Sequence, residues 1–396
     1  KKHKKKNSPR RSISRSRTGF MYCIACCMSS GVNFTIIIRY INHVSHSNIP
    51  FSKHLTPNRT YKKLNSTTQN TTKGRKRAQP QDPENSRSLS LVSHKQRNGT
   101  EEYNVWCIFT RVKEEQTSFR VKFQNMLVSL LKNTNVVISL NVITDVKSRY
   151  MARDVVENAR ISTGKYLNAA YHDVHDLANK IEGIIDIMKK HFSSQPGAYY
   201  SSSLFFISIG LHKVTLMKRA VMLDIDTFVK ADIADLFDEF DNFGADAVIG
   251  AAPELTPVYH HILYSYRLTH KDSKLGTAAS EGGFPGINSG VLLLDLEKMR
   301  KSVIYQGLLI PGEVDKLAKE FKFKGHLGDQ DFYTLIALKH PYLVHLIDCG
   351  WNRQLCTWWR DHGYQTTFHT FAACSSLTKI YHGNCNTHIP KGDTQI

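Results

Sequence analysis

Apolar runs of strand length alternate with amphipathic segments of helix length from residue 104 onward. VVISLNVITD (136–145) is apolar at most positions, as in strands buried on both faces, whereas SFRVKFQNMLVSLLKNT (118–134) repeats apolar residues at helical spacing. We predict strands at 104–112, 136–145, 220–223, 245–253, 286–296 and 342–348, and helices at 118–134, 149–161, 174–192, 202–216, 231–240 and 329–340. This alternation predicts an α/β fold with a mostly parallel central sheet flanked by helices.

The first part of the chain lacks this alternation. Residues 1–17 carry nine basic side chains, and residues 18–38 carry no charge over a length that suits a bilayer span. Because positive charges favour the cytoplasmic side, we predict a basic cytoplasmic tail (1–17) and a transmembrane signal-anchor (18–38). The anchor would place the rest of the chain in a lumen. The alternative is a leader that has no role in a membrane.

Residues 39–100 are polar and contain too few apolar side chains for a core. We therefore predict a disordered stem (39–100) before a folded domain at 101–396. Five N-x-Ser/Thr sequons begin in the first hundred residues and none begins after them, which favours a lumenal stem weakly. They begin at Asn33, Asn58, Asn65, Asn70 and Asn98.

The net charge of +19 belongs to the first hundred residues. They contain 21 Lys or Arg and two acidic residues, whereas residues 101–396 contain 32 of each sign. A folded domain without net charge loses the main electrostatic argument for nucleic-acid binding. We expect no nucleic-acid partner for it, and the basic N-terminal tail is the part that could contact an anionic surface.

The cysteines of the folded domain form two groups. Cys107 stands alone on the first predicted strand and is expected to be a buried thiol. The other four lack the C-x-x-C pairs of a zinc site and are expected to form two disulfides in an oxidising compartment. All three connectivities are open for Cys349, Cys356, Cys374 and Cys385.

Two aspartates, Asp224 and Asp226, directly follow the apolar run of RAVML. Residues i and i+2 of an extended chain point to the same side, and ligands of open parallel sheets bind at the carboxyl ends of strands. Two hard oxygen donors in that position suit Mg²⁺ or Mn²⁺, which also bridge phosphate oxygens. The alternative is a pair of solvated acids where a strand becomes a loop.

Two further motifs place neutral polar groups beside predicted elements. In FPGINSGVLLLDL (284–296), Asn288 and Ser289 stand between glycines just before an apolar strand and offer hydrogen bonds of the kind that sugar hydroxyls need. In GHLGDQDF (325–332), Asp329 and Asp331 flank Gln330 where a helix should begin. We expect one aspartate to cap that helix and Gln330 to lie near a reacting centre.

The C-terminal region contributes a histidine and a tryptophan cluster. His382 follows a short strand in KIYHGNCN and could complete a metal site with the two distant aspartates. Trp358 and Trp359 suit a surface that anchors a sugar or protein partner, whereas Trp351 fits core packing better. The alternative for His382 is a structural histidine.

Together, the motifs LDID, INSGV, GDQD and HG, in this order, resemble those of the family 8 glycosyltransferases, which are retaining, metal-dependent enzymes with a GT-A nucleotide-sugar-binding fold. RQLCTWWRDHGY and KIYHGNCNTHIP are most similar to members that transfer xylose. The resemblance covers about residues 103–390. It implies a UDP-xylose-dependent α-1,3-xylosyltransferase of the endoplasmic reticulum. Together with the signal-anchor predicted at 18–38, we expect a single-pass type II protein of the endoplasmic reticulum membrane with a lumenal catalytic domain. Its implied acceptors are the xylosyl-glucose glycans of EGF repeats in Notch-like proteins.

The resemblance also implies a role for individual residues. The metal, Mn²⁺ with Mg²⁺ possible, would be held by Asp224, Asp226 and His382. The donor would be contacted by Phe109, Thr110, Arg111, Asp145, Ile225, Asn288, Ser289 and Leu327. The acceptor would be contacted by Trp358, Trp359 and Asn384. The catalytic centre would contain Gln330 and Asp329.

These motifs contain no Asp or Glu that is an obvious nucleophile, and the amide of Gln330 is a poor nucleophile. We therefore expect the acceptor hydroxyl to attack from the face that UDP leaves, with the UDP phosphate taking the proton. Three rival functions are a family 8 enzyme with another UDP-sugar donor, a member that binds protein without catalysis, and a nucleic-acid-binding protein, which only residues 1–100 support.

Overall fold

The computed structural model describes residues 102–193 and 202–390. The predicted tail (1–17), signal-anchor (18–38) and stem (39–100) lie outside these residues. Within the described part, no helix has both the length and the apolar character that crossing a membrane requires.

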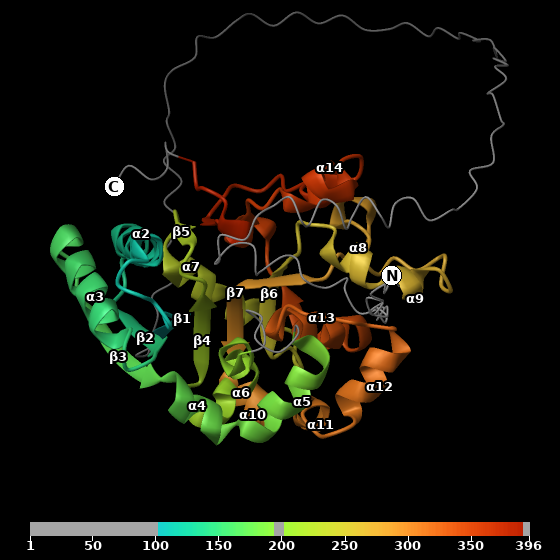
Figure 1. The fold of residues 1–396 in the computed structure, drawn as a ribbon, viewed down its shortest axis with the longest axis horizontal. Coiled ribbons are helices and arrows are strands. Elements are labelled where there is room, and N and C mark those ends of the chain that lie inside the picture. Colours follow the sequence, from blue (N-terminus) through green and yellow to red (C-terminus); the bar gives the residue numbers. More distant parts are fainter. Residues whose placement is uncertain (1–101, 194–201, 391–396) are drawn as a thin grey trace, which may run out of the picture. The chain divides into compact units, whose positions relative to one another are not determined.

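A seven-stranded sheet forms the centre of the described domain (Figure 1), in the order β3-β2-β1-β4-β7-β6-β8. Its strands are β1 (Tyr103–Ile108), β2 (Ile138–Thr144), β3 (Leu167–Asp173), β4 (Arg219–Leu223), β6 (Ile249–Pro253), β7 (Ile287–Asp295) and β8 (Val344–Leu346). Neighbouring strands are parallel except at β7, which runs antiparallel to both β4 and β6. The predicted mostly parallel α/β sheet is therefore confirmed.

The predicted helices occur in the predicted order, with two corrections, and several short helices were not predicted. They are α2 (Thr117–Asn133), α3 (Arg149–Thr163), α4 (Val174–Lys180), α5 (Glu182–Phe192), α6 (Ile207–Val214), α7 (Ile233–Asp238), α8 (Val258–Ile262), α9 (Tyr264–Arg267), α10 (Leu296–Lys301), α11 (Val303–Leu308), α12 (Glu313–Glu320), α13 (Asp329–Lys339) and α14 (Phe368–Phe371). The helix predicted at 174–192 is two helices, because the backbone leaves helical angles at Ile181, whose buried side chain packs on Gly210. The helix predicted at 202–216 begins with a 3-10 turn, Ser203–Phe206.

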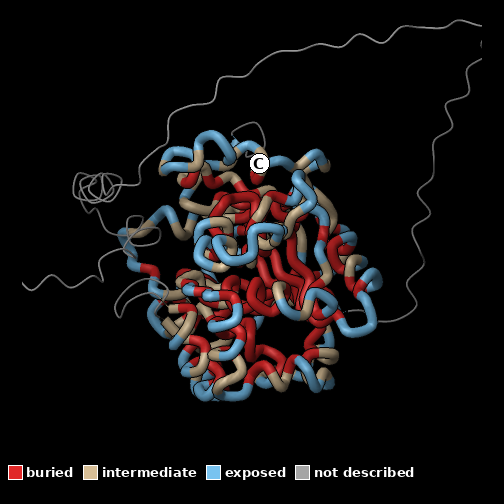
Figure 2. Tube along the Cα trace, turned by 90° about the vertical axis from the view of Figure 1, so that its right-hand side faces the viewer, coloured by how far each residue is buried: buried red, intermediate tan, exposed pale blue. Residues whose placement is uncertain are grey.

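Two hydrophobic cores cover the two faces of the sheet, because alternate residues of each strand point to opposite sides. On β4, Ala220 and Met222 belong to the core beneath α4–α6 and α10–α13, whereas Val221 and Leu223 belong to the core beneath α2, α3 and α7. Figure 2 shows these buried segments gathered inside a shell of exposed ones. A strand buried on both faces must be apolar throughout, which explains the run in front of Asp224.

A second sheet of three short strands ties the C-terminal segment to the end of β4. Its order is β5 (Thr227–Val229), β10 (Ile380–His382) and β9 (Arg353–Gln354). β10 runs antiparallel to β5 and pairs His382 with Thr227. In Figure 1 the C-terminal segment, in red, accordingly lies beside β5. This pairing brings residue 382 next to residues 224–227.

Two disulfides fix the same C-terminal segment. They join Cys349 to Cys374 and Cys356 to Cys385. The predicted pair of disulfides is confirmed, and the structure selects one of the three open connectivities. Cys107 is a buried free thiol, as predicted.

Candidate functional site

The two aspartates stand in a tight turn between β4 and β5. The backbone N–H of Asp224 donates to the carbonyl of Gly290 on β7 at 2.9 Å, and Thr227 closes the turn by donating to the carbonyl of Asp224. The side chain of Asp224 is 60% exposed, whereas that of Asp226 is 21% exposed. The end of the buried strand therefore presents one carboxylate to solvent and one at the rim of the core.

His382 meets both carboxylates. Its Nε2 lies 3.5 Å from Oδ2 of Asp224 and 3.5 Å from Oδ1 of Asp226. The Cα of Gly290 lies under the imidazole, and a Cβ at that position would overlap the ring. The predicted meeting of His382 with the aspartates is therefore confirmed, whereas their role as metal ligands stays a prediction.

The cluster is strongly coupled electrostatically. Burial opposes protonation of His382, but hydrogen bonds and charges from Asp224 and Asp226 outweigh it and raise the pKa of the imidazole to about 10. Burial likewise opposes ionisation of Asp226, but His382 and Lys122 lower its pKa to about 2. Each partner thus stabilises the charged form of the other.

The geometry fits a divalent cation. The candidate ligand atoms of Asp224, Asp226 and His382 all lie within 4.8 Å of one another. Two carboxylate oxygens and one imidazole nitrogen form a mixed oxygen and nitrogen donor set that divalent ions accept. The exposed side of Asp224 leaves room for further ligands from solvent or from a substrate.

The INSG motif lies beside this cluster on a bulge of β7. Between Ala251 and Ala252 of β6, the paired residue on β7 jumps from Leu292 to Asn288, so β7 bulges at residues 289–291. Bulges re-aim side chains next to active sites. The bulge leaves Ser289 without a paired residue on β6, whereas the hydrogen bond from Asp224 to Gly290 continues the regular β4–β7 register.

Gln330 is buried on the first turn of α13, where its amide both accepts and donates. Its Oε1 accepts from the backbone N–H of Ser289 at 3.2 Å, and its Nε2 donates to Oε2 of Glu254 at 3.2 Å. Glu254 follows β6 directly and is 2% exposed, and burial raises the pKa of its carboxyl. The two faces of the Gln330 amide are thus held by β7 and by Glu254.

The predicted cap of α13 by an aspartate is wrong, because the residue before the helix is Gly328. Asp329 accepts from the hydroxyl of Ser208 at 2.5 Å, and burial raises its pKa to about 7. Asp331 is fully buried and accepts from the hydroxyl of Tyr259 and from the backbone N–H of Leu327. Both aspartates serve tertiary contacts in place of a helix cap.

The residues predicted around the nucleotide lie on the loops that follow β1 and β2, at the same sheet edge as Asp224. Phe109 is buried and stacks on Phe123, so contact with a donor would have to come from its backbone. Thr110 is half-buried. Arg111 adopts a positive φ of 58°, and its backbone N–H donates to the carboxylate of Asp145.

Asp145 organises this loop. Burial works against its ionised form, but backbone N–H groups of Arg111, Ser148 and Lys147 and the hydroxyl of Ser148 lower its pKa below the usual value. Both of its carboxylate oxygens are therefore engaged by the protein. A contact from Asp145 to a nucleotide stays a prediction.

The residues predicted at the acceptor lie after β9 and β10. Trp358 stacks on His362 with ring centroids 3.9 Å apart, and Trp359 packs against His261 and Tyr364. Oδ1 of Asn384 accepts from the backbone N–H groups of residues 355 and 356, beside the Cys356–Cys385 disulfide. Trp351 is a core residue, as predicted, and donates to Glu239.

Two predicted donor contacts are half-buried residues next to the central motifs. Ile225 lies between the paired aspartates and packs against one core, and Leu327 precedes α13 and packs against the other. Their places fit contacts to a ligand at this edge, and those contacts stay predictions.

Three residues of the site were not predicted from the sequence: Lys122, Glu254 and Asn352. Lys122, on α2, places its Nζ 3.5 Å from Oδ2 of Asp226. Glu254 carries a signal that could have been used, since it follows the apolar run VIGAAP as the aspartates follow RAVML. Asn352, beside Trp351, has no comparable signal in the sequence.

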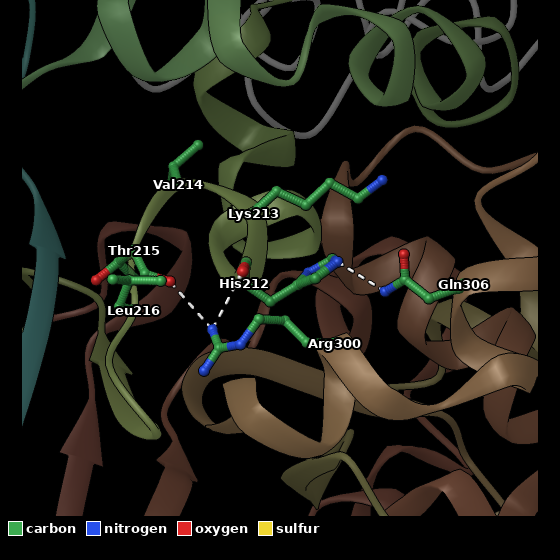
Figure 3. Close-up of a pocket in the computed structure, with 7 residues that line it drawn as sticks. All are labelled: His212, Lys213, Val214, Thr215, Leu216, Arg300 and Gln306. Carbon is green, nitrogen blue, oxygen red and sulfur yellow. Dashed lines mark hydrogen bonds between the residues drawn. The ribbon is translucent and has the colours of Figure 1, made fainter.

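A cavity of about 530 Å³ lies elsewhere in the described domain (Figure 3). It is lined by His212, Lys213, Val214, Thr215, Leu216, Arg300 and Gln306. Arg300 donates to the carbonyls of residues 212, 215 and 217, which end α6 and lead into β4. The cavity therefore lies at the start of β4, at the opposite end from Asp224.

Comparison with known proteins relates the described domain to one family of enzymes. Residues 107–370 match the protein family described as "Glycosyl transferase family 8". Xyloside xylosyltransferase 1 of Homo sapiens is 42% identical over 300 residues, covering 74% of this chain and 76% of that protein. Its counterpart in Mus musculus is 42% identical over 297 residues, covering 73% and 75%. The apo crystal structure of mouse xyloside xylosyltransferase 1 has a TM-score of 0.69 at 41% identity and covers 73% of this chain and 100% of that one.

Proposed function

The chain belongs to glycosyl transferase family 8, and from this premise we propose that it is a retaining, UDP-xylose-dependent α-1,3-xylosyltransferase. The proposed acceptor is a xylosyl-glucose glycan O-linked to EGF repeats of Notch-like proteins. The observation that carries the proposal is the cluster of Asp224, Asp226 and His382 at the end of β4, next to the bulge of β7 that holds Gln330. The relatives' xylosyltransferase names support the choice of xylose.

Asp224, Asp226 and His382 are the residues that would hold the cation. We propose Mn²⁺, with Mg²⁺ as the alternative, because transition-metal ions accept imidazole ligands more readily than Mg²⁺ does. When bound, the cation supplies positive charge that stabilises the departing diphosphate. Lys122 contributes a further positive charge at 3.5 Å from Asp226.

The proposed reaction proceeds on one face of the sugar. The acceptor hydroxyl oxygen forms a bond to the anomeric carbon while the bond from that carbon to UDP breaks, and a phosphate oxygen of UDP takes the hydroxyl proton. The α configuration is thereby retained. The carboxylates near Gln330 support this path, because both are engaged by the protein and neither is a free nucleophile. Glu254 accepts three hydrogen bonds, and Asp329 accepts one from Ser208.

A covalent route is tested by mass spectrometry of the intact protein after incubation with UDP-xylose and Mn²⁺ without acceptor. We expect the protein mass to stay unchanged. A pentosyl adduct mapped to Gln330, Asp329 or Glu254 would contradict attack from the face that UDP leaves.

Donor choice is tested with equal concentrations of UDP-xylose, UDP-glucose, UDP-galactose and UDP-glucuronic acid, an EGF repeat carrying xylosyl-glucose, and Mn²⁺. We expect transfer from UDP-xylose to dominate. Transfer from another donor in the absence of transfer from UDP-xylose would replace the proposed donor, and acceptor binding without any transfer would favour a non-catalytic role.

We further propose a type II topology in the endoplasmic reticulum, with residues 101–396 in the lumen. The two disulfides support an oxidising compartment. If the proposal holds, Asn58, Asn65, Asn70 and Asn98 face the glycosylation machinery, and endoglycosidase H increases the mobility of the expressed chain. A chain without glycans whose domain is digested by protease in intact microsomes would overturn this topology.

A further inference from the structure

A continuous chain of side-chain hydrogen bonds connects His382 to Gln330. His382 Nδ1 lies 3.0 Å from Oδ1 of Asn352, and Nδ2 of Asn352 donates to Oδ1 of Asn288 at 2.9 Å. Nδ2 of Asn288 then donates to Oε2 of Glu254 at 3.0 Å, which also accepts from Nε2 of Gln330 at 3.2 Å. We call Glu254, Asn288, Gln330, Asn352 and His382 the amide relay.

Backbone N–H groups fix the direction of the amide relay. The N–H of Gly290 donates to Oδ1 of Asn288, so Nδ2 of that amide must face Glu254. The N–H of Ser289 donates to Oε1 of Gln330, so the Nε2 of Gln330 also faces Glu254. Main-chain donors thus orient the amides of Asn288 and Gln330, and the NH₂ group of each amide donates to the carboxylate of Glu254.

The orientation of these amides also determines which nitrogen of His382 donates. Because Asn352 uses its Nδ2 on Asn288, it presents Oδ1 to His382, and an oxygen can only accept. His382 therefore donates from Nδ1, which leaves Nε2 as the atom that faces Asp224 and Asp226. A hydrogen bond of this kind on the far nitrogen orients a ligating imidazole and selects its tautomer.

Water cannot substitute for these partners. The exposed fractions are 2% for Glu254, 5% for Asn288, 8% for Gln330, 0% for Asn352 and 4% for His382. Hydrogen bonds in such a buried network are stronger than at the surface, and a lost partner is costly to the network. If Glu254 is replaced, the other residues of the amide relay must therefore adjust their hydrogen bonds without help from solvent.

We propose that Glu254 is a positioning residue that acts at both ends of the amide relay. It holds the amide of Gln330 in one orientation and, through Asn288 and Asn352, holds His382 with Nε2 toward the two aspartates. This inference rests on the proposed metal site. It adds that two parts of the site more than 50 residues apart, Gln330 and His382, are aligned by one buried carboxylate that touches neither substrate nor cation.

The test begins with Glu254→Gln in the full chain. A carboxylate accepts on both oxygens, here from the N–H of Thr256 on one and from two amides on the other. A glutamine must turn its NH₂ toward one side, so it loses either the bond from Thr256 or both bonds from Asn288 and Gln330. We expect Mn²⁺ affinity, measured by calorimetry, to fall about tenfold, as for other groups that orient metal ligands. We also expect kcat to fall more than KM for the sugar donor rises, because Gln330 is misaligned.

Glu239→Gln is the matched control, since Glu239 is half-buried and bonded to Trp351 but lies outside the relay. It should bind Mn²⁺ as the unaltered chain does. If the unaltered chain does not bind Mn²⁺, the proposed metal site fails. If the unaltered chain and Glu254→Gln bind Mn²⁺ equally, the metal site stands and the relay is refuted.

Asn352→Asp tests the route of the effect. An aspartate at this position accepts from His382 Nδ1 by itself, so the histidine no longer depends on the rest of the relay. In this background, Glu254→Gln should change Mn²⁺ affinity by less than about twofold while still lowering kcat. An undiminished effect on Mn²⁺ affinity would show that Glu254 does not act through Asn352.

If Glu254→Gln does not fold, Asn352→Ala addresses the same proposal from the other end. It removes the acceptor of His382 Nδ1 and leaves the contact between Glu254 and Gln330 in place. The relay predicts about tenfold weaker Mn²⁺ binding. Unchanged Mn²⁺ binding by a folded Asn352→Ala protein would overturn the proposal.

Discussion

The absence of a side chain at Gly290 lets the His382 ring reach the two aspartates. A Cβ there would overlap the imidazole, so Gly290→Ala must push the ring away from Asp224 and Asp226. We expect roughly tenfold weaker Mn²⁺ binding and a stability loss of about 1–3 kcal/mol from overpacking. Calorimetric titration and chemical denaturation measure the two effects.

Gly307→Ala is the matched control for this prediction. Gly307 lies within α11, and a Cβ there would meet no atom within 4 Å. Alanine should keep Mn²⁺ binding intact and add about 0.5–1 kcal/mol of stability, because it lowers the backbone entropy lost on folding. Equal Mn²⁺ affinity in the two alanine variants would contradict the account of Gly290.

Asp331 gives the domain a specific dependence of stability on pH. Burial raises its pKa to about 7, although hydrogen bonds from Leu327 and Tyr259 act against the rise, and the ordinary value is 3.8. Between these values the folded state holds a proton that the unfolded state has lost. The stabilisation is therefore present below about pH 4 and is lost as the pH rises toward 7.

Asp331→Asn removes this titration. Relative to the variant, the unaltered chain should lose up to about 1.4 kcal/mol of unfolding free energy per pH unit between pH 4 and 7. Denaturant unfolding in EDTA at pH 5 and pH 7.5, followed by tryptophan fluorescence, measures the difference. A gap between the two proteins that is the same at both pH values would show that Asp331 is not protonated in the folded state at pH 5.

Among the elements, the three-stranded sheet decides whether the site exists, because β10 brings His382 to β5. The Cys356–Cys385 disulfide closes a loop with a sequence separation of 29, which begins just after β9 and contains β10. Replacing both cysteines by alanine should cost about 2–4 kcal/mol of stability. It should also weaken Mn²⁺ binding, because β10 is then held by a few main-chain hydrogen bonds.

Cys107→Ala provides the comparison, since it removes a buried thiol of β1 that lies outside this sheet. It should lower stability without changing Mn²⁺ affinity. A variant that lacks the Cys356–Cys385 disulfide and is less stable, yet binds Mn²⁺ normally, would show that β10 keeps its place without this covalent link.

The elements that could be predicted are those buried on both faces or long enough to show a period. β4, β7, α2 and α13 have this character, and each was predicted within a few residues. β3 was missed because it lies at the sheet edge, where only its first residue is buried, and its sequence, LNAAYHD, has no long apolar run. Helices α8 to α12 have four to eight residues, too few for a helical repeat to stand out.

The candidate site could be predicted where each residue carries its own local signal. Asp224, Asp226 and Gln330 stand at the ends of apolar elements, so their chemistry was visible in short segments. Asn352 was not visible, because its importance comes from contacts with residues 30 and 64 positions away. The break at Ile181 likewise depends on packing against another helix, which periodicity does not reveal.

At the scale of the whole molecule, one edge of the central sheet, the three-stranded sheet and the buried amide relay meet in a single xylosyltransferase site. The most direct test is xylose transfer from UDP-xylose to an EGF repeat carrying xylosyl-glucose, measured for the full chain with Mn²⁺, with EDTA, and for Asp226→Asn with Mn²⁺. We expect an α-linked xylose product with Mn²⁺ and loss of transfer in the other two reactions. Undiminished transfer in EDTA or by Asp226→Asn, or no transfer from UDP-xylose under any of these conditions, would contradict this expectation.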